Sequence, residues 1–164
     1  MENPKEDTLS IFPTKILLAT DGSEEASLAA KAATDIANLS GSELHVAHVE
    51  QYPPYLLAEY GTYAYIDGQM LQTALEEVES KARKTLDEQV GNIEGAGGTV
   101  TRSYLRRGRP DRVIVDLAEE IGAGLIVMGS RGLGGIRGAL MGSVSGSVVR
   151  HAHCPVLVAR PEKE

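Results

Sequence analysis

The stretch "GLIVMGSRGLGGIRGALMGS", residues 124–143, decides the fold because it joins three local patterns in one run. It begins as a short apolar segment of the kind that forms a buried strand. A segment rich in glycine follows and ends at Gly142 and Ser143, where a helical pattern over residues 143–151 begins. A buried strand that continues through a glycine-rich turn into a helix is typical of parallel α/β proteins.

The alternation of strands and helices continues on both sides of this stretch. Further segments with the length and composition of strands are residues 15–20, 43–49, 99–105 and 155–160. Strands separated by helices pair in parallel, because parallel neighbours need a crossover connection. The sequence therefore predicts an α/β fold: a single domain with an open, parallel, five-stranded sheet and helices on both faces.

The helices between these strands carry start and stop signals. Ser23 precedes two glutamates and predicts the start of a helix that ends at Gly41. A stripe of apolar residues predicts a long helix over residues 67–90. Pro110, which suits a first helical turn, opens a shorter helix that ends at Gly122.

The composition limits the classes of partner. The chain has 164 residues, a net charge of -7 at pH 7 and a pI near 5.1, so no nucleic-acid or anionic-membrane partner is expected. No segment approaches the roughly 18 apolar residues of a membrane helix. The single Cys154 cannot form an internal disulfide, and the acidic N-terminus is unlike a signal peptide. We expect a cytoplasmic protein in which residues 1–12 form a flexible arm before a domain over residues 13–164.

Ligands of open parallel sheets bind beyond the carboxyl ends of the strands, where the strand order reverses. In this chain those ends are "ATDG" after the first strand, "HVEQ" after the second and the glycine-rich segment after the fourth. Common phosphate-binding motifs fit the glycines poorly. A P-loop requires a lysine, and none occurs between Lys84 and Lys163, while a dinucleotide-binding fingerprint would follow the first strand.

The glycine-rich segment has a different spacing: Gly129, two residues, Gly132, nine residues, then Gly142 and Ser143. Together with "TDGS" at residues 20–23 and "HCPVLVAR" at residues 153–160, this spacing resembles the universal stress protein family, in its ATP-binding branch. The resemblance covers nearly the whole chain and makes residues 13–164 a universal stress protein domain. It implies a Rossmann-like fold of the adenine-nucleotide α-hydrolase type.

The residues themselves also favour phosphate binding at this edge. Glycines such as Gly129 and Gly132 let backbone N–H groups approach a polyanion with no Cβ in the way. Gly142 and Ser143 begin a helix, whose unpaired N–H groups and dipole attract phosphate. Hydrogen bonds to charged groups contribute about 1.5–3 kcal/mol each, so a few amides suffice for micromolar affinity.

The resemblance also implies which residues form the site. Adenine and ribose would lie toward Ala19, Thr20 and Asp21. Val49 would offer backbone contacts to the base, and Met128 would line the floor. The residues implied for the triphosphate are Gly129, Gly132, Gly142, Ser143, Val144 and Ser145. Arg131, between the first two of these glycines, could add positive charge beside the phosphates or could simply be solvated. The implied ligand is ATP, accompanied by Mg²⁺.

Several of these residues also have plainer roles. Asp21 could be a turn residue before the Ser23 cap, and Ser143 and Ser145 could simply begin a helix. The glycines could form only a flexible loop, and those inside the nine-residue spacer suggest mobility rather than contacts. "HAHC" at residues 151–154 suggests a metal site at first sight, but residues two apart do not share a helix face, so no metal centre is expected.

The segment over residues 50–69 contains five of the six tyrosines. A connection of this length is often functional, and tyrosine suits half-wet interfaces. Three interpretations stay open for it: a lid over the nucleotide, a surface for a partner, or an insertion that packs on its own helix.

The motif and the resemblance favour a stress-response regulator in which ATP changes the conformation or the choice of a downstream partner. A phosphate cradle is present without a dedicated catalytic constellation, so no catalytic residue is assigned and hydrolysis is expected to be slow at most. The alternatives are a genuine ATPase or nucleotidyl-transfer enzyme and a scaffold that no longer binds ATP. The last strand leaves an exposed sheet edge, and the resemblance implies a homodimer through it.

Overall fold

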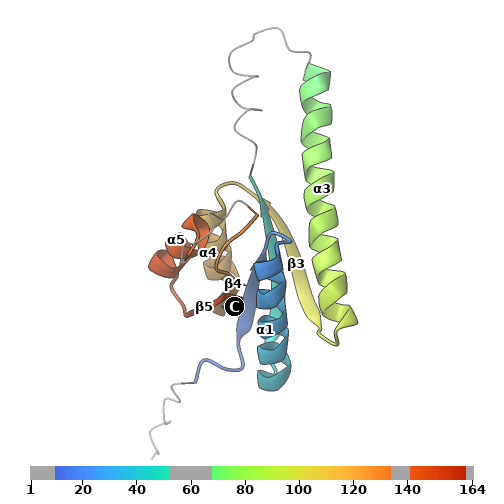
Figure 1. Ribbon diagram of the computed structural model, residues 1–164. Helices are drawn as coiled ribbons and strands as arrows, with labels where there is room; N and C mark the ends of the chain where they lie inside the picture. The colour runs from blue at the N-terminus through green and yellow to red at the C-terminus, as the bar shows by residue number, and fades with distance from the viewer. Residues whose placement is uncertain (1–9, 52–67, 134–140, 162–164) are drawn as a thin grey trace, which may run out of the picture.

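The computed structural model describes residues 10–51, 68–133 and 141–161, in which strands and helices alternate along the chain (Figure 1). The elements are β1 (Lys15–Thr20), α1 (Glu24–Ser40), β2 (Glu43–Glu50), α3 (Gly68–Gly95), β3 (Val100–Arg107), α4 (Pro110–Ile121), β4 (Ala123–Gly129), α5 (Ser143–His151) and β5 (Val156–Ala159). Every strand and helix that the sequence predicts is present, which confirms the α/β class.

The five strands form one parallel sheet in the order β3-β2-β1-β4-β5. The chain moves outward from β1 to β2 and β3, and then crosses back so that β4 pairs with the other side of β1. The strand order therefore reverses between β1 and β4. The crevice beyond the carboxyl ends of these two central strands is the place where open α/β sheets bind ligands.

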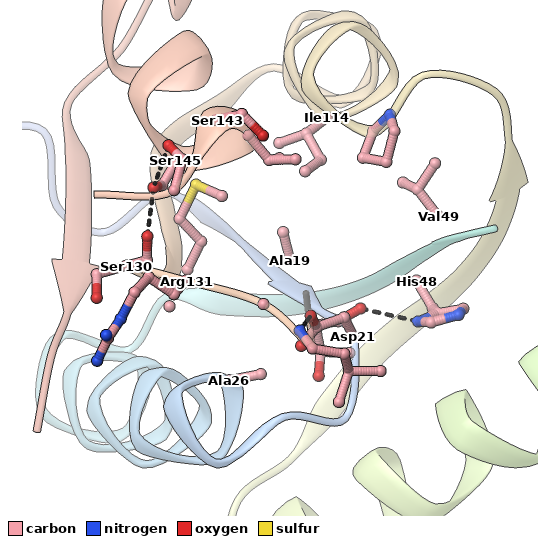
Figure 2. A pocket seen from close by; sticks show the side chains of 18 of the residues that line it. Ala19, Asp21, Ala26, His48, Val49, Ile114, Ser130, Arg131, Ser143 and Ser145 are labelled. Atoms are coloured by element: carbon pink, nitrogen blue, oxygen red, sulfur yellow. Dashed lines mark hydrogen bonds between the residues drawn. The ribbon is translucent and has the colours of Figure 1, made fainter. Parts of the chain in front are cut away.

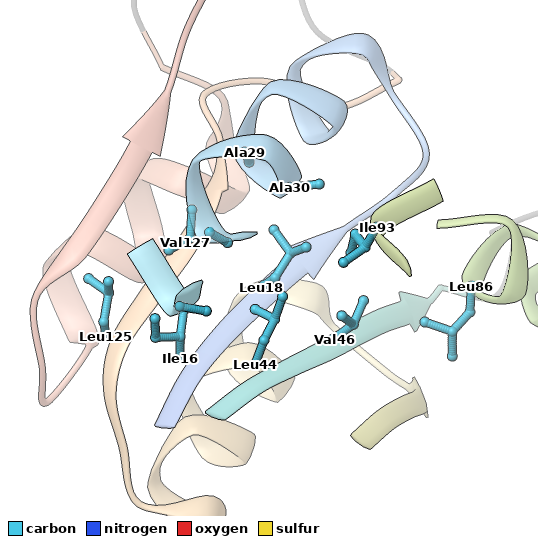
Figure 3. Close-up of a cluster of buried hydrophobic side chains, with 12 residues drawn as sticks. Ile16, Leu18, Ala29, Ala30, Leu44, Val46, Leu86, Ile93, Leu125 and Val127 are labelled. Atoms are coloured by element: carbon cyan, nitrogen blue, oxygen red, sulfur yellow. The ribbon is translucent and has the colours of Figure 1, made fainter. Parts of the chain in front are cut away.

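Side chains alternate between two buried clusters, one on each face of the sheet. Ile16 and Leu18 of β1 belong to the cluster under α1 and α3, where Leu86 of α3 is fully buried (Figure 3). Leu17 and Ala19 belong to the opposite cluster, under α4 and α5. Because successive strand residues point to opposite faces, this alternation shows that both faces of the sheet are covered by helices.

The predicted helix signals are confirmed. The Ser23 hydroxyl accepts a hydrogen bond from the Ala26 amide at 3.2 Å and so caps α1. Gly41 and Gly122 end α1 and α4 with φ values of 68° and 67°, which a residue without a Cβ adopts easily. Pro110 occupies the first turn of α4. None of the helices in the described ranges has the length and apolar character to cross a membrane.

Two elements continue two or more residues past their predicted ends. Helix α3 continues past residue 90 to Gly95, because Ile93, which is 3% exposed, extends its buried stripe. Strand β3 continues to Arg107, which is paired with Glu50 in β2. Residues 1–9 of the predicted arm and residues 52–67 of the tyrosine-rich segment lie outside the described residues, so the interpretations of both segments stay predictions.

Candidate functional site

A cavity of about 620 Å³ lies at the carboxyl ends of the central strands (Figure 2). Its walls come from the last residues of β1, β2 and β4, from the segments that follow them, from the start of α4 and from the first turn of α5. Cavities of about 300–1,000 Å³ are the usual size for small-molecule ligands and cofactors. The cavity therefore occupies the position that the strand order predicts for a ligand.

All the residues that the sequence assigned to a binding site line this one cavity. They are Ala19, Thr20, Asp21, Val49, Met128, Gly129, Arg131, Gly132, Gly142, Ser143, Val144 and Ser145. The fold thus gathers residues from widely separated parts of the chain at one place. Their individual roles toward a nucleotide stay predictions, and the contacts below show which of their groups face other protein atoms.

One half of the cavity is apolar. Its lining includes the small residues Ala19 and Ala47 and the larger apolar residues Val49, Ile114 and Met128. Figure 2 shows Ala19, Val49 and Ile114. Such a slot suits a flat aromatic base, which gains from apolar burial and from main-chain polar groups at its edge. Ala47 and Ile114 are not among the predicted site residues. Ala47 lies one residue before the predicted strand end "HVEQ", and Ile114 belongs to α4, which follows a strand whose end was not predicted to contribute.

Ser130 holds the beginning of the glycine-rich loop and was not predicted as a site residue. Its amide donates to the Ala159 carbonyl at 2.8 Å, and its carbonyl accepts from the Gly142 amide at 2.7 Å and the Ser145 hydroxyl at 2.6 Å. The residue is only 1% exposed. It therefore joins the end of β4 to β5 and to the start of α5. The sequence signal for this role is a polar residue directly after a buried strand.

The start of α5 presents backbone N–H groups at the cavity. The first backbone hydrogen bond of the helix is donated by the Gly146 amide to the Gly142 carbonyl, at 3.0 Å. As in any helix, the N–H groups of the first turn, here Ser143, Val144 and Ser145, have no carbonyl acceptor inside the helix. The Ser145 hydroxyl is already hydrogen-bonded within the protein. The amide is therefore the polar group of Ser145 that is left for a ligand.

Arg131 is paired with Glu25 from the first turn of α1. Its Nε and Nη2 atoms lie 2.8 Å and 2.7 Å from Glu25 Oε1, and its amide donates to Glu25 Oε2 at 2.7 Å. The Ser130 hydroxyl donates to the same Oε2 atom. From the sequence, Glu25 is only a helix-start signal, and Arg131 is expected to add charge beside the phosphates. In this structure the guanidinium faces a carboxylate of the protein.

The Glu25 contacts predict how stability depends on acid. Burial alone would raise the pKa of Glu25, but the hydrogen bonds from Ser130 and Arg131 and the guanidinium charge together lower it. A carboxyl group with a lowered pKa stabilises the fold at neutral pH, and this contribution is lost as the pH falls through that pKa. Below about pH 4.3, we expect the melting temperature of the wild type to fall more steeply than that of Glu25→Gln. Thermal unfolding from pH 7 to 3 tests this, and parallel curves would contradict it.

Asp21 connects the turn after β1 with the glycine-rich loop. Its Oδ1 atom accepts from the Ser23 amide and its Oδ2 atom accepts from the Leu133 amide, both at 3.0 Å. A Cβ atom added to Gly132 would collide with Asp21 Oδ2. The turn role that the sequence left open for Asp21 is therefore present, and the same carboxylate also fixes the loop at the mouth of the cavity.

Thr20 lines the cavity, but its hydroxyl is hydrogen-bonded within the protein. That hydroxyl donates to Gln89 Oε1 in α3 and accepts from the Gly22 amide, both at 3.3 Å. The Thr20 carbonyl accepts from His48 Nδ1 at 2.9 Å. The end of β1 is thereby tied to α3 and β2.

The histidines of "HAHC" contact main-chain atoms. His151 Nδ1 lies 2.8 Å from the Ser147 carbonyl, and His153 Nε2 lies 3.1 Å from the Ala123 carbonyl. Across the described ranges, no three histidine, cysteine, aspartate or glutamate side chains gather in a way that could hold a metal ion. Burial raises the pKa of the Cys154 thiol, which makes it a poor nucleophile at neutral pH.

Comparison with known proteins places the chain among related sequences. Residues 13–160 match the universal stress protein family. The chain is similar to the universal stress protein MJ0531 of Methanocaldococcus jannaschii, with 35% identity over 152 residues, covering 92% of this chain and 84% of that protein.

Solved structures show the same arrangement of elements. The hypothetical protein MJ0577 superposes with a TM-score of 0.77 at 25% identity, covering 94% of this chain and 100% of that one. A universal stress protein in complex with cAMP has a TM-score of 0.64 at 26% identity, covering 92% and 99% of the two chains. One from Archaeoglobus fulgidus in complex with dAMP has a TM-score of 0.62 at 25% identity, covering 92% and 100%.

Proposed function

The chain belongs to the universal stress protein family, and from that premise we propose that its cavity binds ATP and that the protein acts as a nucleotide-dependent regulator in the stress response. One observation carries the proposal. A cavity of about 620 Å³, lined by apolar residues from β1, β2, α4 and β4, lies next to the first turn of α5 at the point where the strand order reverses. The related structures with cAMP and dAMP support an adenine nucleotide as the class of ligand.

The proposed pose follows the chemistry of the walls. The base lies between Val49 and Met128, the ribose lies toward Asp21, and the phosphates lie along Gly132 and the start of α5. Adenine gains from apolar burial, while a polyanion gains from unpaired amides and from the positive end of the helix dipole. We propose that Mg²⁺ accompanies the triphosphate, with the Asp21 carboxylate as the protein group that would hold a water of its hydration shell.

A regulatory role is favoured over rapid turnover because the charged groups at the cavity already have protein partners. Both carboxylate oxygens of Asp21 accept main-chain amides, and the Arg131 guanidinium is paired with Glu25. Phosphoryl transfer needs a group that orients the attacking water and a cation that stabilises the transition state. We therefore propose that ATP is held and hydrolysed slowly at most, and that its presence changes conformation or partner choice.

We also propose a cytoplasmic homodimer formed through β5. This strand ends the sheet beyond β4, and its residues Val156–Ala159 are all half-buried. An open edge of this kind pairs readily with a second strand. Light scattering after size exclusion at micromolar concentration should give twice the chain mass of 17.5 kDa, and a monomer mass would contradict the dimer.

Nucleotide identification tests the proposed function. Freshly purified protein is extracted with acid and the released nucleotide is identified by mass, and stripped protein is then titrated with ATP, ADP, AMP, cAMP and GTP. We expect ATP in the extract or a micromolar dissociation constant for it, with turnover below about 1 s⁻¹. An ADP-filled site with faster turnover would support the enzyme alternative, and equal or absent binding of all five nucleotides would overturn the proposal.

A further inference from the structure

We propose that Glu25 is a positioning residue of the phosphate site, which fixes the start of the glycine-rich loop and keeps Arg131 away from the phosphates. The inference rests on the proposed nucleotide function. The Glu25–Arg131 ion pair lies beside the cavity and affects the ligand only through the residues that it positions. The phosphates are then bound by backbone amides, and Arg131 acts as a structural partner of Glu25.

The Glu25 carboxylate binds three groups of the loop at once. Oε1 receives the Arg131 guanidinium, and Oε2 receives both the Arg131 amide and the Ser130 hydroxyl. Glu25 is 9% exposed, so these contacts are made with little competition from water. Hydrogen bonds to an ionised group are stronger than those between neutral groups. Loss of one partner is costly at a buried site, because the remaining polar group stays desolvated without a hydrogen bond.

The loop also begins in close contact with the backbone of α1. A Cβ on Gly129 would lie 2.9 Å from the Glu25 carbonyl carbon and 3.1 Å from the Ala26 amide nitrogen, so the end of β4 rests directly on the helix backbone. The helix start is itself capped by Ser23. Glu25 therefore binds the loop from the capped first turn of α1, whose backbone also contacts the end of β4.

Ser130 connects this ion pair to the proposed phosphate-binding amides. Ser130, held by Glu25 through its hydroxyl, accepts the Gly142 amide and the Ser145 hydroxyl with its carbonyl. Those two residues belong to the first turn of α5 and its cap. A shift of Ser130 would therefore also shift the start of α5, whose N–H groups face the cavity. Glu25 acts on this helix through Ser130, because none of the hydrogen bonds of its carboxylate goes to α5.

A substitution at Glu25 separates this role from a simple charge effect. A glutamine has one carbonyl oxygen and cannot accept at both positions, so Glu25→Gln should weaken ATP binding at least about tenfold and change adenosine binding less than about twofold. Glu24→Gln is the matched control, because Glu24 is an exposed carboxylate in the same helical turn. It removes the same charge and should leave both affinities within about twofold. Isothermal titration measures both ligands, and melting temperatures confirm that each variant is folded.

Arg131 provides the opposing test. If Glu25 and Arg131 act as a unit, Arg131→Gln weakens ATP binding like Glu25→Gln, and the double variant is little worse than either single one. If Arg131 were instead a phosphate ligand restrained by Glu25, Glu25→Gln would release it and ATP would bind as tightly as in the wild type or more tightly. That result would overturn the inference.

Hydrogen exchange distinguishes failure of this inference from failure of the proposed function. If the wild type binds neither ATP nor adenosine, the nucleotide function is wrong, but the loop can still be examined. Faster amide exchange at residues 130–133 in Glu25→Gln than in Glu24→Gln would show that Glu25 orders the loop. Equal exchange in the two variants would overturn the positioning role.

Discussion

Replacing Gly129 with alanine is expected to abolish nucleotide binding and to destabilise the fold. The added Cβ would lie 2.9 Å from the carbonyl carbon of Glu25, 3.0 Å from its Cβ and 3.1 Å from the Ala26 amide nitrogen. Two of these are backbone atoms, which cannot rotate away, so the end of β4 would have to separate from α1. Overpacking of this kind costs about 1–3 kcal/mol. The shift would also carry Ser130 away from Gly142 and disturb the phosphate-binding amides.

Thermal unfolding and ATP titration measure the two effects of Gly129→Ala. In a chain of this size, each kcal/mol corresponds to a melting-temperature change of about 2–4 °C. Gly91→Ala is the control, because Gly91 lies in α3 and a Cβ there meets nothing within 4 Å. It should stabilise the helix by about 0.5–1 kcal/mol, the opposite sign. A Gly129→Ala variant with unchanged melting temperature and affinity would show that the close approach is not required.

The sequence was sufficient to predict the elements because their signals are local. The Ser23 cap, the Gly41 stop and the Pro110 start each depend on a few neighbouring residues and on backbone geometry. Once five strands alternate with helices, parallel pairing limits the architecture, and the carboxyl ends of the strands share one edge. This is why the segments that contain Asp21 and Ser143 are expected at one edge of the sheet, whereas the roles of these two residues toward a nucleotide come from the family resemblance.

The groups that face the ligand could not be predicted in the same way. A glutamate in a first helical turn is expected for reasons of helix polarity, and an arginine in a glycine-rich loop is expected to meet an anion. Glu25 and Arg131 satisfy each other instead, because the end of β4 crosses the start of α1. Likewise the Thr20 hydroxyl turns to Gln89. Such pairings depend on distances between elements, which no local pattern encodes.

The contacts at the loop have a common consequence for binding. Asp21 holds the Leu133 amide, Glu25 holds the Arg131 amide, and Ser130 holds the Gly142 amide, so the described part of the loop is ordered by the protein itself. A loop that is already in place needs less ordering when a ligand arrives, and this lowers the entropic cost of association. The amides at the start of α5 then become the part of the site that the phosphates would engage most directly.

Replacing Ser143 with glutamate is expected to weaken ATP binding about 100-fold while leaving the fold as stable as before or more stable. Ser143 is the first residue of α5 and is exposed. An acidic residue at a helix N-terminus stabilises the helix by about 0.3–1 kcal/mol. The same carboxylate would repel a triphosphate at this helix start, since two unit charges about 4 Å apart near a protein surface interact by about 4 kcal/mol before salt screening. Affinity and stability should therefore change in opposite directions.

Titration of Ser143→Glu and Ser143→Gln with ATP and adenosine isolates the charge. Glutamine has nearly the same size as glutamate and no charge, so it should retain ATP binding within about fivefold, and adenosine should bind both variants alike. A general loss of both ligands would indicate that the longer side chain blocks the cavity. If Ser143→Glu binds ATP as the wild type does, the phosphates do not lie at the start of α5, because no arrangement of a triphosphate against these N–H groups would be indifferent to a carboxylate at the first residue of the helix.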